Sequence, residues 1–242
     1  MNRQAQGVLL LVAGGTVLRT SSTDLYLRYV KTGLRPLLIL TGIVLIAAAL
    51  ATFWYELRAA RAARRISPDQ ADGDDHAHRE PRIAWLLVVP VLALIVVLPP
   101  ALGSYTADHT GTALTQSLGF SPLAVGDPVQ ISLVDYAGRA VYDHGRSLAG
   151  RRVRITGFVT VAGRGEPILT RMILNCCAAD AQPIKVGLTG KLPPGLRPDA
   201  WLDVVGTYTA RQIKDDVNGG PIPFIDVSNA TPVRAPSDQY EN

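Results

Sequence analysis

Two long stretches without a charged residue constrain this chain more than any other feature of its sequence. They cover residues 36–55 and residues 83–102. Each matches the ~20 apolar residues that an α-helix needs to cross ~30 Å of hydrocarbon at ~1.5 Å per residue. Pro90 would kink the second stretch, which a membrane helix tolerates. A helix in the core of a soluble protein would show a polar face, and neither stretch has one, so we expect two transmembrane helices here.

A third apolar stretch, within residues 5–20, lies near the start of the chain. Its core, residues 7–18, has only 12 residues, a length that suits a signal peptide or an interfacial segment as well as a span. No small-x-small cleavage motif follows, because the chain continues with Arg19, Thr20 and Ser21. We therefore expect an uncleaved, short or extended span, which makes two to three spans within residues 1–103.

The basic residues around these stretches predict how the chain is oriented in the membrane. The loop of residues 56–82 carries six arginines, residues 19–35 carry four basic side chains, and residues 103–138 carry none. Cytoplasmic loops are enriched in Lys and Arg, so we expect loop 56–82 in the cytoplasm and the C-terminal half outside it. The same flanking charges account for the net charge of +4, and with only 6% aromatic residues we expect no nucleic-acid partner.

The C-terminal half has the alternating pattern of short β-strands. We expect a connector over residues 104–149, mostly irregular up to residue 123 and with short helices over 131–148, followed by a soluble domain over residues 150–242. Residue 153 and every second residue after it to 159 form one face of the first strand. Gly157 and Gly206 lie inside strands, where glycine permits the sharp bend of a barrel corner. We expect an OB-like barrel, with a small sandwich as the alternative; its strands would cover residues 152–161, 168–175, 183–189, 201–210 and 222–234.

A polar loop between the two long apolar stretches contains a possible set of metal ligands. Asp74, Asp75, His76 and His78 lie within five residues and offer nitrogen and oxygen ligands for Zn²⁺ or a similar ion. The alternative is a solvated loop whose histidines have no such role.

The densest constellation lies near residue 176. The adjacent Cys176 and Cys177 would point to opposite faces of a straight strand, but a bend over residues 175–178 would turn them toward Asp180. The three could then bind a divalent metal such as zinc, although a complete site needs four ligands. Arg171 is a candidate neighbour that could favour a thiolate or bind a ligand. Two alternatives stay open: thiol redox or nucleophilic chemistry, and buried structural cysteines with Asp180 capping a turn.

Two motifs give the chain a family resemblance. Residues 150–159 read GRRVRITGFV and residues 171–184 read RMILNCCAADAQPI. Together with the N-terminal spans and the histidine-bearing loop, they resemble the YcgQ-type permease subunit family of bacterial membrane proteins, over essentially the whole chain. The resemblance implies a plasma-membrane protein that works with a separate multi-span permease, and it carries over no catalytic residue. Members often have a longer histidine run than His76 and His78, which weakens a metal-delivery role for the loop.

These observations favour one function and leave a second open. The spans carry no ionisable group at membrane depth, which makes the chain a poor transporter alone, so we expect an accessory subunit of a permease with a ligand- or partner-binding β domain. The alternative is a membrane-anchored metal- or thiol-binding module that uses Cys176, Cys177 and Asp180. We expect no enzyme, because the sequence lacks a nucleophile elbow, an HExxH motif and a P-loop.

Overall fold

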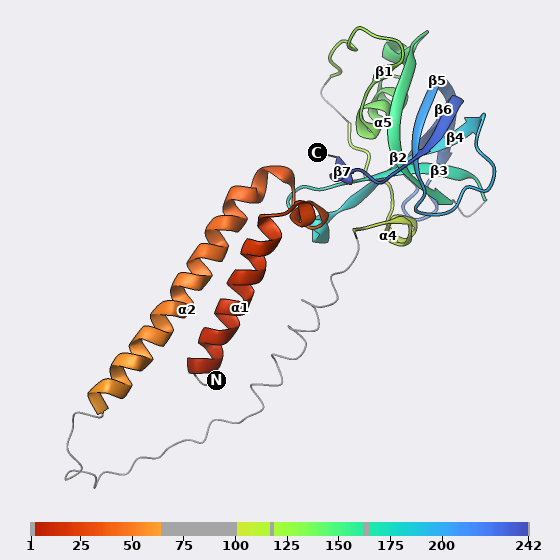
Figure 1. The fold of residues 1–242 in the computed structure, drawn as a ribbon. Helices are drawn as coiled ribbons and strands as arrows, with labels where there is room; N and C mark the ends of the chain where they lie inside the picture. Colours follow the sequence, from red (N-terminus) through yellow and green to blue (C-terminus); the bar gives the residue numbers. More distant parts are fainter. Residues whose placement is uncertain (1–2, 64–100, 117–118, 162–164, 242) are drawn as a thin grey trace. The chain divides into compact units, whose positions relative to one another are not determined.

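The computed structural model describes residues 3–63, 101–116, 119–161 and 165–241, which fall into two compact units (Figure 1). The described residues up to Tyr26, together with those from Thr32 to Ala63, form a helical unit. Residues 27–31 and the residues from Ala101 onward form a β-rich unit. The short segment 27–31 therefore belongs to the C-terminal domain, although it lies between two N-terminal helices in the sequence.

The helical unit is a pair of packed helices, α1 (Arg3–Ser21) and α2 (Arg35–Ala63), joined by the 3-10 turns η1 (Asp24–Arg28) and η2 (Thr32–Leu34). Glycines bring α1 and α2 close together. A Cβ on Gly14 would lie 3.0 Å from the carbonyl oxygen of Gly42, and a Cβ on Gly42 would lie 2.7 Å from Cγ of Leu18. Close backbone approach through small residues is typical of helix pairs in membranes.

One described helical stretch, Thr32–Ala59, is long and apolar enough to cross a membrane. It contains the predicted span 36–55, and only 11% of its apolar window is buried. Its exposed apolar side chains are each more than half exposed; they include Leu37, Leu40, Ile43, Val44, Leu50 and Trp54. Helix α1 covers the predicted span 5–20, but it is not among the helices that are long and apolar enough to cross a membrane. All but the last two residues of the predicted span 83–102 lie outside the described residues. The structure thus supports membrane anchoring through one helix.

The connector is more regular than its sequence suggests. The mostly irregular stretch expected up to residue 123 contains one short helix that the sequence did not reveal, α4 (Ser104–His109). This helix forms because the Asp199 carboxylate accepts hydrogen bonds from the backbone N–H (2.6 Å) and the hydroxyl (2.9 Å) of Ser104. The short helices expected over residues 131–148 are confirmed as α5 (Leu133–Tyr142) and η4 (Arg146–Leu148). The Ser132 hydroxyl caps α5 by accepting from the N–H of Asp135.

The β domain is a closed five-stranded barrel (Figure 1), so the barrel prediction is confirmed and the sandwich alternative is wrong. Strand β2 pairs with β3 and β5, β4 pairs with β3 and β6, and β5 pairs with β6, which completes the ring. Two short strands that the sequence did not reveal extend the sheet: β1 (Val129–Gln130) beside β2 and β7 (Tyr240–Glu241) beside β3. The barrel strands are β2 (Arg152–Val161), β3 (Pro167–Ile173), β4 (Gln182–Gly190), β5 (Trp201–Lys214) and β6 (Pro221–Val233).

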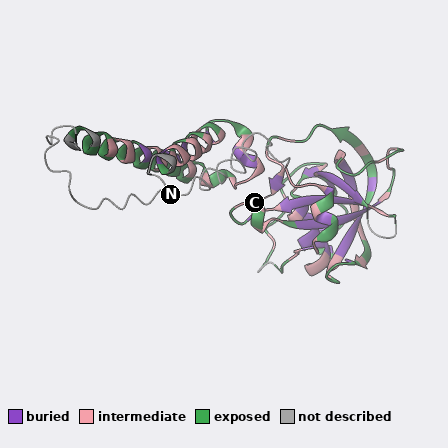
Figure 2. Cartoon of the chain, turned by 90° about the horizontal axis from the view of Figure 1, so that it is seen from below, coloured by how far each residue is buried: buried purple, intermediate pink, exposed green. Residues whose placement is uncertain are grey.

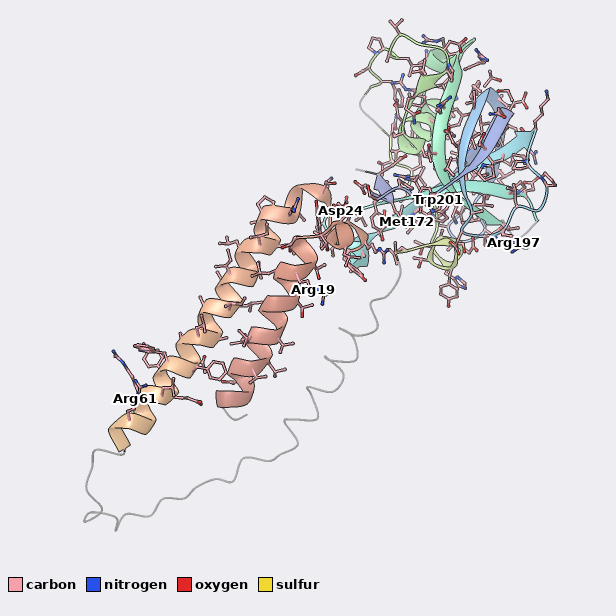
Figure 3. All side chains as sticks on the ribbon, in the orientation of Figure 1. Arg19, Asp24, Arg61, Met172, Arg197 and Trp201 are labelled. Atoms are coloured by element: carbon pink, nitrogen blue, oxygen red, sulfur yellow. The ribbon has the colours of Figure 1, made fainter. Side chains whose placement is uncertain are left out.

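Burial follows the predicted alternation in the barrel and departs from it at one place. Figure 2 shows the buried residues gathered in the barrel strands, whereas α1 and α2 are mostly exposed or half-buried. The predicted inner face of β2 is buried, as at Val153 and Ile155. Phe158 points to the other face and is buried as well, because a second apolar cluster covers the barrel there. In this cluster Met172 and Tyr240 are buried beside Trp201, and Figure 3 labels Met172 and Trp201.

The two glycines predicted at barrel corners lie where other backbone comes very close. A Cβ on Gly157 would lie 2.7 Å from the carbonyl oxygen of Thr170, and one on Gly206 would lie 2.4 Å from that of Asp226. The pairing of β5 with β6 also shifts register between Val205 and Gly206. These positions need glycine because no side chain fits against the neighbouring strand.

Candidate functional site

The two cysteines lie in a tight bend between β3 and β4, which we call the thiol bend (residues 174–181). The Asp180 carboxylate shapes this bend by accepting hydrogen bonds from the backbone N–H groups of Asn175 (3.1 Å) and Cys176 (2.9 Å). Aspartate commonly folds a turn in this way, by bonding to nearby backbone. The chain therefore turns where the sequence analysis placed a bend, and the side chains of Cys176 and Cys177 are not forced onto opposite faces.

The bend brings together three groups that can bind a metal. The sulfur atoms of Cys176 and Cys177 and a carboxylate oxygen of Asp180 lie within 4.8 Å of one another. Cys176 is exposed and the other two residues are half-buried, so the cysteines are not buried structural hydrophobes. Two sulfur ligands and one oxygen suit a borderline or soft cation such as Zn²⁺, and three ligands leave one coordination position open.

The thiol of Cys176 is held in its protonated form. It donates a hydrogen bond to the Asp180 carboxylate, with sulfur and oxygen 3.0 Å apart. This bond, together with a contact to Cys177, raises the pKa of Cys176 to about 11 and lowers the pKa of Asp180. Thiolate is the reactive form of cysteine, so the bend disfavours nucleophilic chemistry at neutral pH. A metal ion would displace the proton and use the same sulfur.

Replacing the carboxylate should therefore release the thiol. In the variant Asp180→Asn we expect the pKa of Cys176 to fall toward its ordinary value, because the negative charge that favours the S–H form is gone and an amide can donate to a thiolate. At pH 8.5 alkylation of Cys176, followed in a Cys177→Ser background, should be at least about tenfold faster than with Asp180 present. Equal alkylation rates with and without Asp180 would contradict the hydrogen bond as the cause.

The bend also holds the segment that joins the two N-terminal helices. We call residues 27–31 the docked connector. Val30 and Cys177 form an antiparallel bridge. The N–H of Ala178 donates to the carbonyl of Tyr29 (2.7 Å), and the N–H of Lys31 donates to the carbonyl of Cys176 (3.1 Å). The residues that carry the candidate ligands are therefore the same residues that bind the docked connector.

A tyrosine near the C-terminus fixes the docked connector at its other end. The Tyr240 hydroxyl donates to the carbonyl of Arg28 (2.9 Å) and accepts from the N–H of Leu102 (3.1 Å). Burial raises the pKa of Tyr240, so the hydroxyl keeps the proton that it donates. Tyr240 thus joins the docked connector to the start of the C-terminal domain.

Arg171 contacts the C-terminal segment. Its guanidinium stacks 5.0 Å from the centre of the Trp201 ring and donates to the carbonyl oxygens of Asp238 and Tyr240, both at 3.2 Å. Its Nε lies 3.9 Å from the carboxylate of Glu241. That carboxylate accepts from the first two N–H groups of α5, at 2.8 and 2.9 Å. The polar contacts of Arg171 within the described residues therefore anchor β7, and thiolate activation is not among the roles they support.

Several of these residues escaped the sequence analysis for a common reason. Tyr240 and Glu241 form a strand of two residues, and the docked connector is also short, so none shows a periodic pattern. No local signal of cap, turn or period could have found them. Of the predicted metal ligands, His76 and His78 lie outside the described residues.

Comparison with known proteins identifies a family match for the C-terminal part of the chain. Searches of curated proteins and of solved structures gave no match. A family model does match, and it begins at β1 and ends at β7, so it covers the barrel, α5 and the thiol bend together. The model describes the DUF1980 C-terminal domain and matches residues 129–241, so the chain is consistent with a family of proteins that contain this domain.

Proposed function

We propose that this protein is an accessory subunit of a membrane permease whose β domain, outside the cytoplasm, binds a ligand or a partner. The observation that carries the proposal is helix α2, which has an exposed apolar surface and no charged residue between residues 36 and 55. Transport sites at membrane depth usually contain ionisable or strongly polar groups. A helix without them suits an anchor that packs beside a separate transporting protein, as the resemblance to the YcgQ-type family also suggests.

The architecture of the barrel supports a binding role for the domain. In chain order, the first strand pairs with the second and fourth, and the third lies parallel to the fifth. This order favours the OB-like class, a small Greek-key barrel that binds ligands through one face and its loops. Fold alone does not fix the ligand.

The contacts of the docked connector support an orientation. Residues 27–31 are bonded to the domain that begins at Ala101, so both lie on one side of any membrane that α2 crosses. The predicted span 83–102 would return the chain across the membrane to that side. The predicted loop 56–82 begins within α2, which continues to Ala63. With the six arginines of residues 56–82 in the cytoplasm, the domain lies outside it.

Labelling with a membrane-impermeant maleimide tests this orientation. The background is Cys176→Ser/Cys177→Ser, and the reporters are Asn229→Cys on the exposed part of β6 and His78→Cys in loop 56–82. In spheroplasts we expect labelling at residue 229 and none at residue 78, and labelling at both after permeabilisation. The opposite pattern would reverse the orientation and with it an extracytoplasmic role.

A second function is favoured by the cluster of two sulfur atoms and one carboxylate. In this proposal the protein is a membrane-anchored metal- or thiol-binding module, with Cys176, Cys177 and Asp180 as ligands. Elemental analysis should find about one equivalent of a divalent metal such as zinc in the purified full chain. It should find none in the Cys176→Ser/Cys177→Ser variant. The same substitution should leave co-purification of a permease intact. Equal metal content in both proteins would reject the metal site and would not affect the accessory role.

A further inference from the structure

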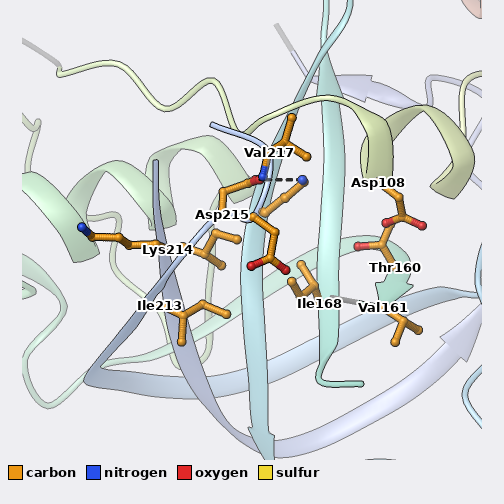
Figure 4. A pocket seen from close by; sticks show the side chains of 11 residues that line it. Asp108, Thr160, Val161, Ile168, Ile213, Lys214, Asp215 and Val217 are labelled. Carbon is orange, nitrogen blue, oxygen red and sulfur yellow. Dashed lines mark hydrogen bonds and ion pairs between the residues drawn. The ribbon is translucent and has the colours of Figure 1, made fainter. Parts of the chain in front are cut away.

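A pocket at the far end of the barrel from the thiol bend combines a buried ion pair with an apolar wall (Figure 4). It has a volume of about 280 Å³ and lies among the end of β2, the start of β3, the middle of β4 and the loop between β5 and β6. The thiol bend follows the last residue of β3, Ile173, whereas the pocket is lined by Ile168 near the first. Its volume is below the ~300–1,000 Å³ typical of sites for drug-sized ligands, so it suits a small molecule.

The floor of the pocket holds an ion pair, Lys185 and Asp215. Nζ lies 2.8 Å from the carboxylate, and the two side chains are 7% and 1% exposed. The Asp215 carboxylate also accepts from the backbone N–H of Thr112 (2.9 Å) and Val217 (2.8 Å). Lys185 donates a second hydrogen bond, to the carbonyl of Thr110 (2.9 Å). An ammonium group has three donors, so within the described residues Lys185 keeps one N–H for a ligand.

The rim of the pocket carries a carboxylate. Asp108, on α4, is exposed and accepts no hydrogen bond from the described residues. Partial burial raises its pKa, although the nearby positive charge of Lys185 acts in the opposite direction. Asp108 and Lys185 line the same small pocket, so one ligand that fills it can contact both. Three isoleucines, Ile168, Ile213 and Ile222, supply the apolar part of the lining.

We propose that this pocket binds a free α-amino acid with an aliphatic side chain. The ligand's carboxylate accepts from the remaining N–H of Lys185, its ammonium pairs with Asp108, and its side chain packs on the isoleucines. In an α-amino acid the ammonium and the carboxylate are attached to the same carbon, so one small ligand offers both charges to the lining. The inference rests on the ligand-binding role proposed for the β domain and names the ligand class.

The charges of the lining exclude other small ligands. Three aspartates and two lysines line the pocket, which leaves one negative charge. Phosphate and dicarboxylates bring only negative charge to this lining and carry no ammonium to pair with Asp108, whereas an amino acid adds no net charge. A purely apolar molecule would leave the last N–H of Lys185 without an acceptor. A ligand with a carboxylate, an ammonium and an aliphatic side chain can contact Lys185, Asp108 and the isoleucines together.

Titration calorimetry on the full chain in detergent micelles tests the proposal with matched ligands. L-Leucine should bind. 4-Methylpentanoate lacks the ammonium, 3-methylbutylamine lacks the carboxylate and glycine lacks the side chain, and each should bind at least about tenfold more weakly. Equal binding of leucine and 4-methylpentanoate would exclude Asp108 as a partner and overturn the proposal, as would the absence of leucine binding.

Two variants locate the site. Asp108→Asn should weaken leucine binding at least about tenfold and leave 4-methylpentanoate unchanged, because only the pairing with the ammonium is lost. The control is Asp226→Asn, an exposed carboxylate on β6 outside the pocket, which should bind leucine as the unchanged chain does. Both are exposed, so both should fold, and thermal melting confirms this. Unchanged leucine binding in Asp108→Asn would place the site elsewhere.

The outcomes separate this inference from the proposed function. If leucine does not bind but the chain still co-purifies with a permease, the amino-acid site is wrong and the accessory role stands. If leucine binds but no permease co-purifies, the accessory role is wrong and the amino-acid site stands.

Discussion

Replacing Asp215 with alanine is expected to destabilise the β domain by about 3–5 kcal/mol, because it leaves the buried ammonium of Lys185 without its counter-charge. The change also removes the acceptor for two backbone N–H groups, those of Thr112 and Val217. Buried donors without acceptors add to the cost.

Urea denaturation of the full chain in detergent, followed by the β-sheet signal in circular dichroism, measures this effect. The matched control is the double variant Lys185→Met/Asp215→Leu, which removes both charges and should cost less than Asp215→Ala alone. A single variant that unfolds at the urea concentration of the unchanged protein would show that the pair contributes little to stability.

Acidification should weaken the same interaction. Burial favours the neutral form of Asp215, but the hydrogen bonds from Lys185 and from the backbone N–H groups outweigh it, and the net pKa lies below the usual range. A carboxyl group whose pKa is lower in the folded state stabilises the fold above its unfolded pKa, near 3.9. That contribution is lost as the pH falls through the folded pKa. In Asp215→Ala the stability should therefore fall less steeply between about pH 5 and pH 2.

The second large effect is expected from Gly206→Ala, which should cost about 1–3 kcal/mol. The new Cβ would lie 2.4 Å from the carbonyl oxygen of Asp226 and 2.8 Å from Cγ1 of Ile225, and the first of these is backbone that cannot move aside. The β5–β6 pairing at this corner would have to open. The same urea titration measures the decrease in the free energy of unfolding.

Gly33→Ala is the matched control for Gly206→Ala. A Cβ on Gly33 meets no atom within 4 Å, and the residue is exposed. The control should stay within about 0.5 kcal/mol of the unchanged chain. Equal stability of Gly206→Ala and Gly33→Ala would contradict the close strand approach at the barrel corner.

The barrel was predictable because its signals are local. Alternation in β2 identified Val153 and Ile155 as inner residues, and both are buried. Glycine inside β2 and β5 indicated corners, and at Gly157 and Gly206 neighbouring strands do approach too closely for a side chain. A single carboxylate three residues after a cysteine pair was enough to suggest the bend at Asp180.

What the sequence concealed depends on contacts between distant parts of the chain. Lys185 alternates with Ile184 and Val186, so it would be expected on a solvent face, yet it is buried because Asp215 lies against it from another strand end. The bond from Tyr240 to Arg28 joins residues 212 positions apart. Periodicity within a strand carries no information about such partners.

Co-purification of membrane proteins with the full chain tests the accessory role most directly. An affinity-tagged chain, solubilised in mild detergent and purified, should carry a multi-span membrane protein in constant ratio. The Cys176→Ser/Cys177→Ser variant should retain that protein, because the proposed contact lies along α2 and not at the thiol bend. A chain that purifies alone, or only with a water-soluble partner, would contradict the account.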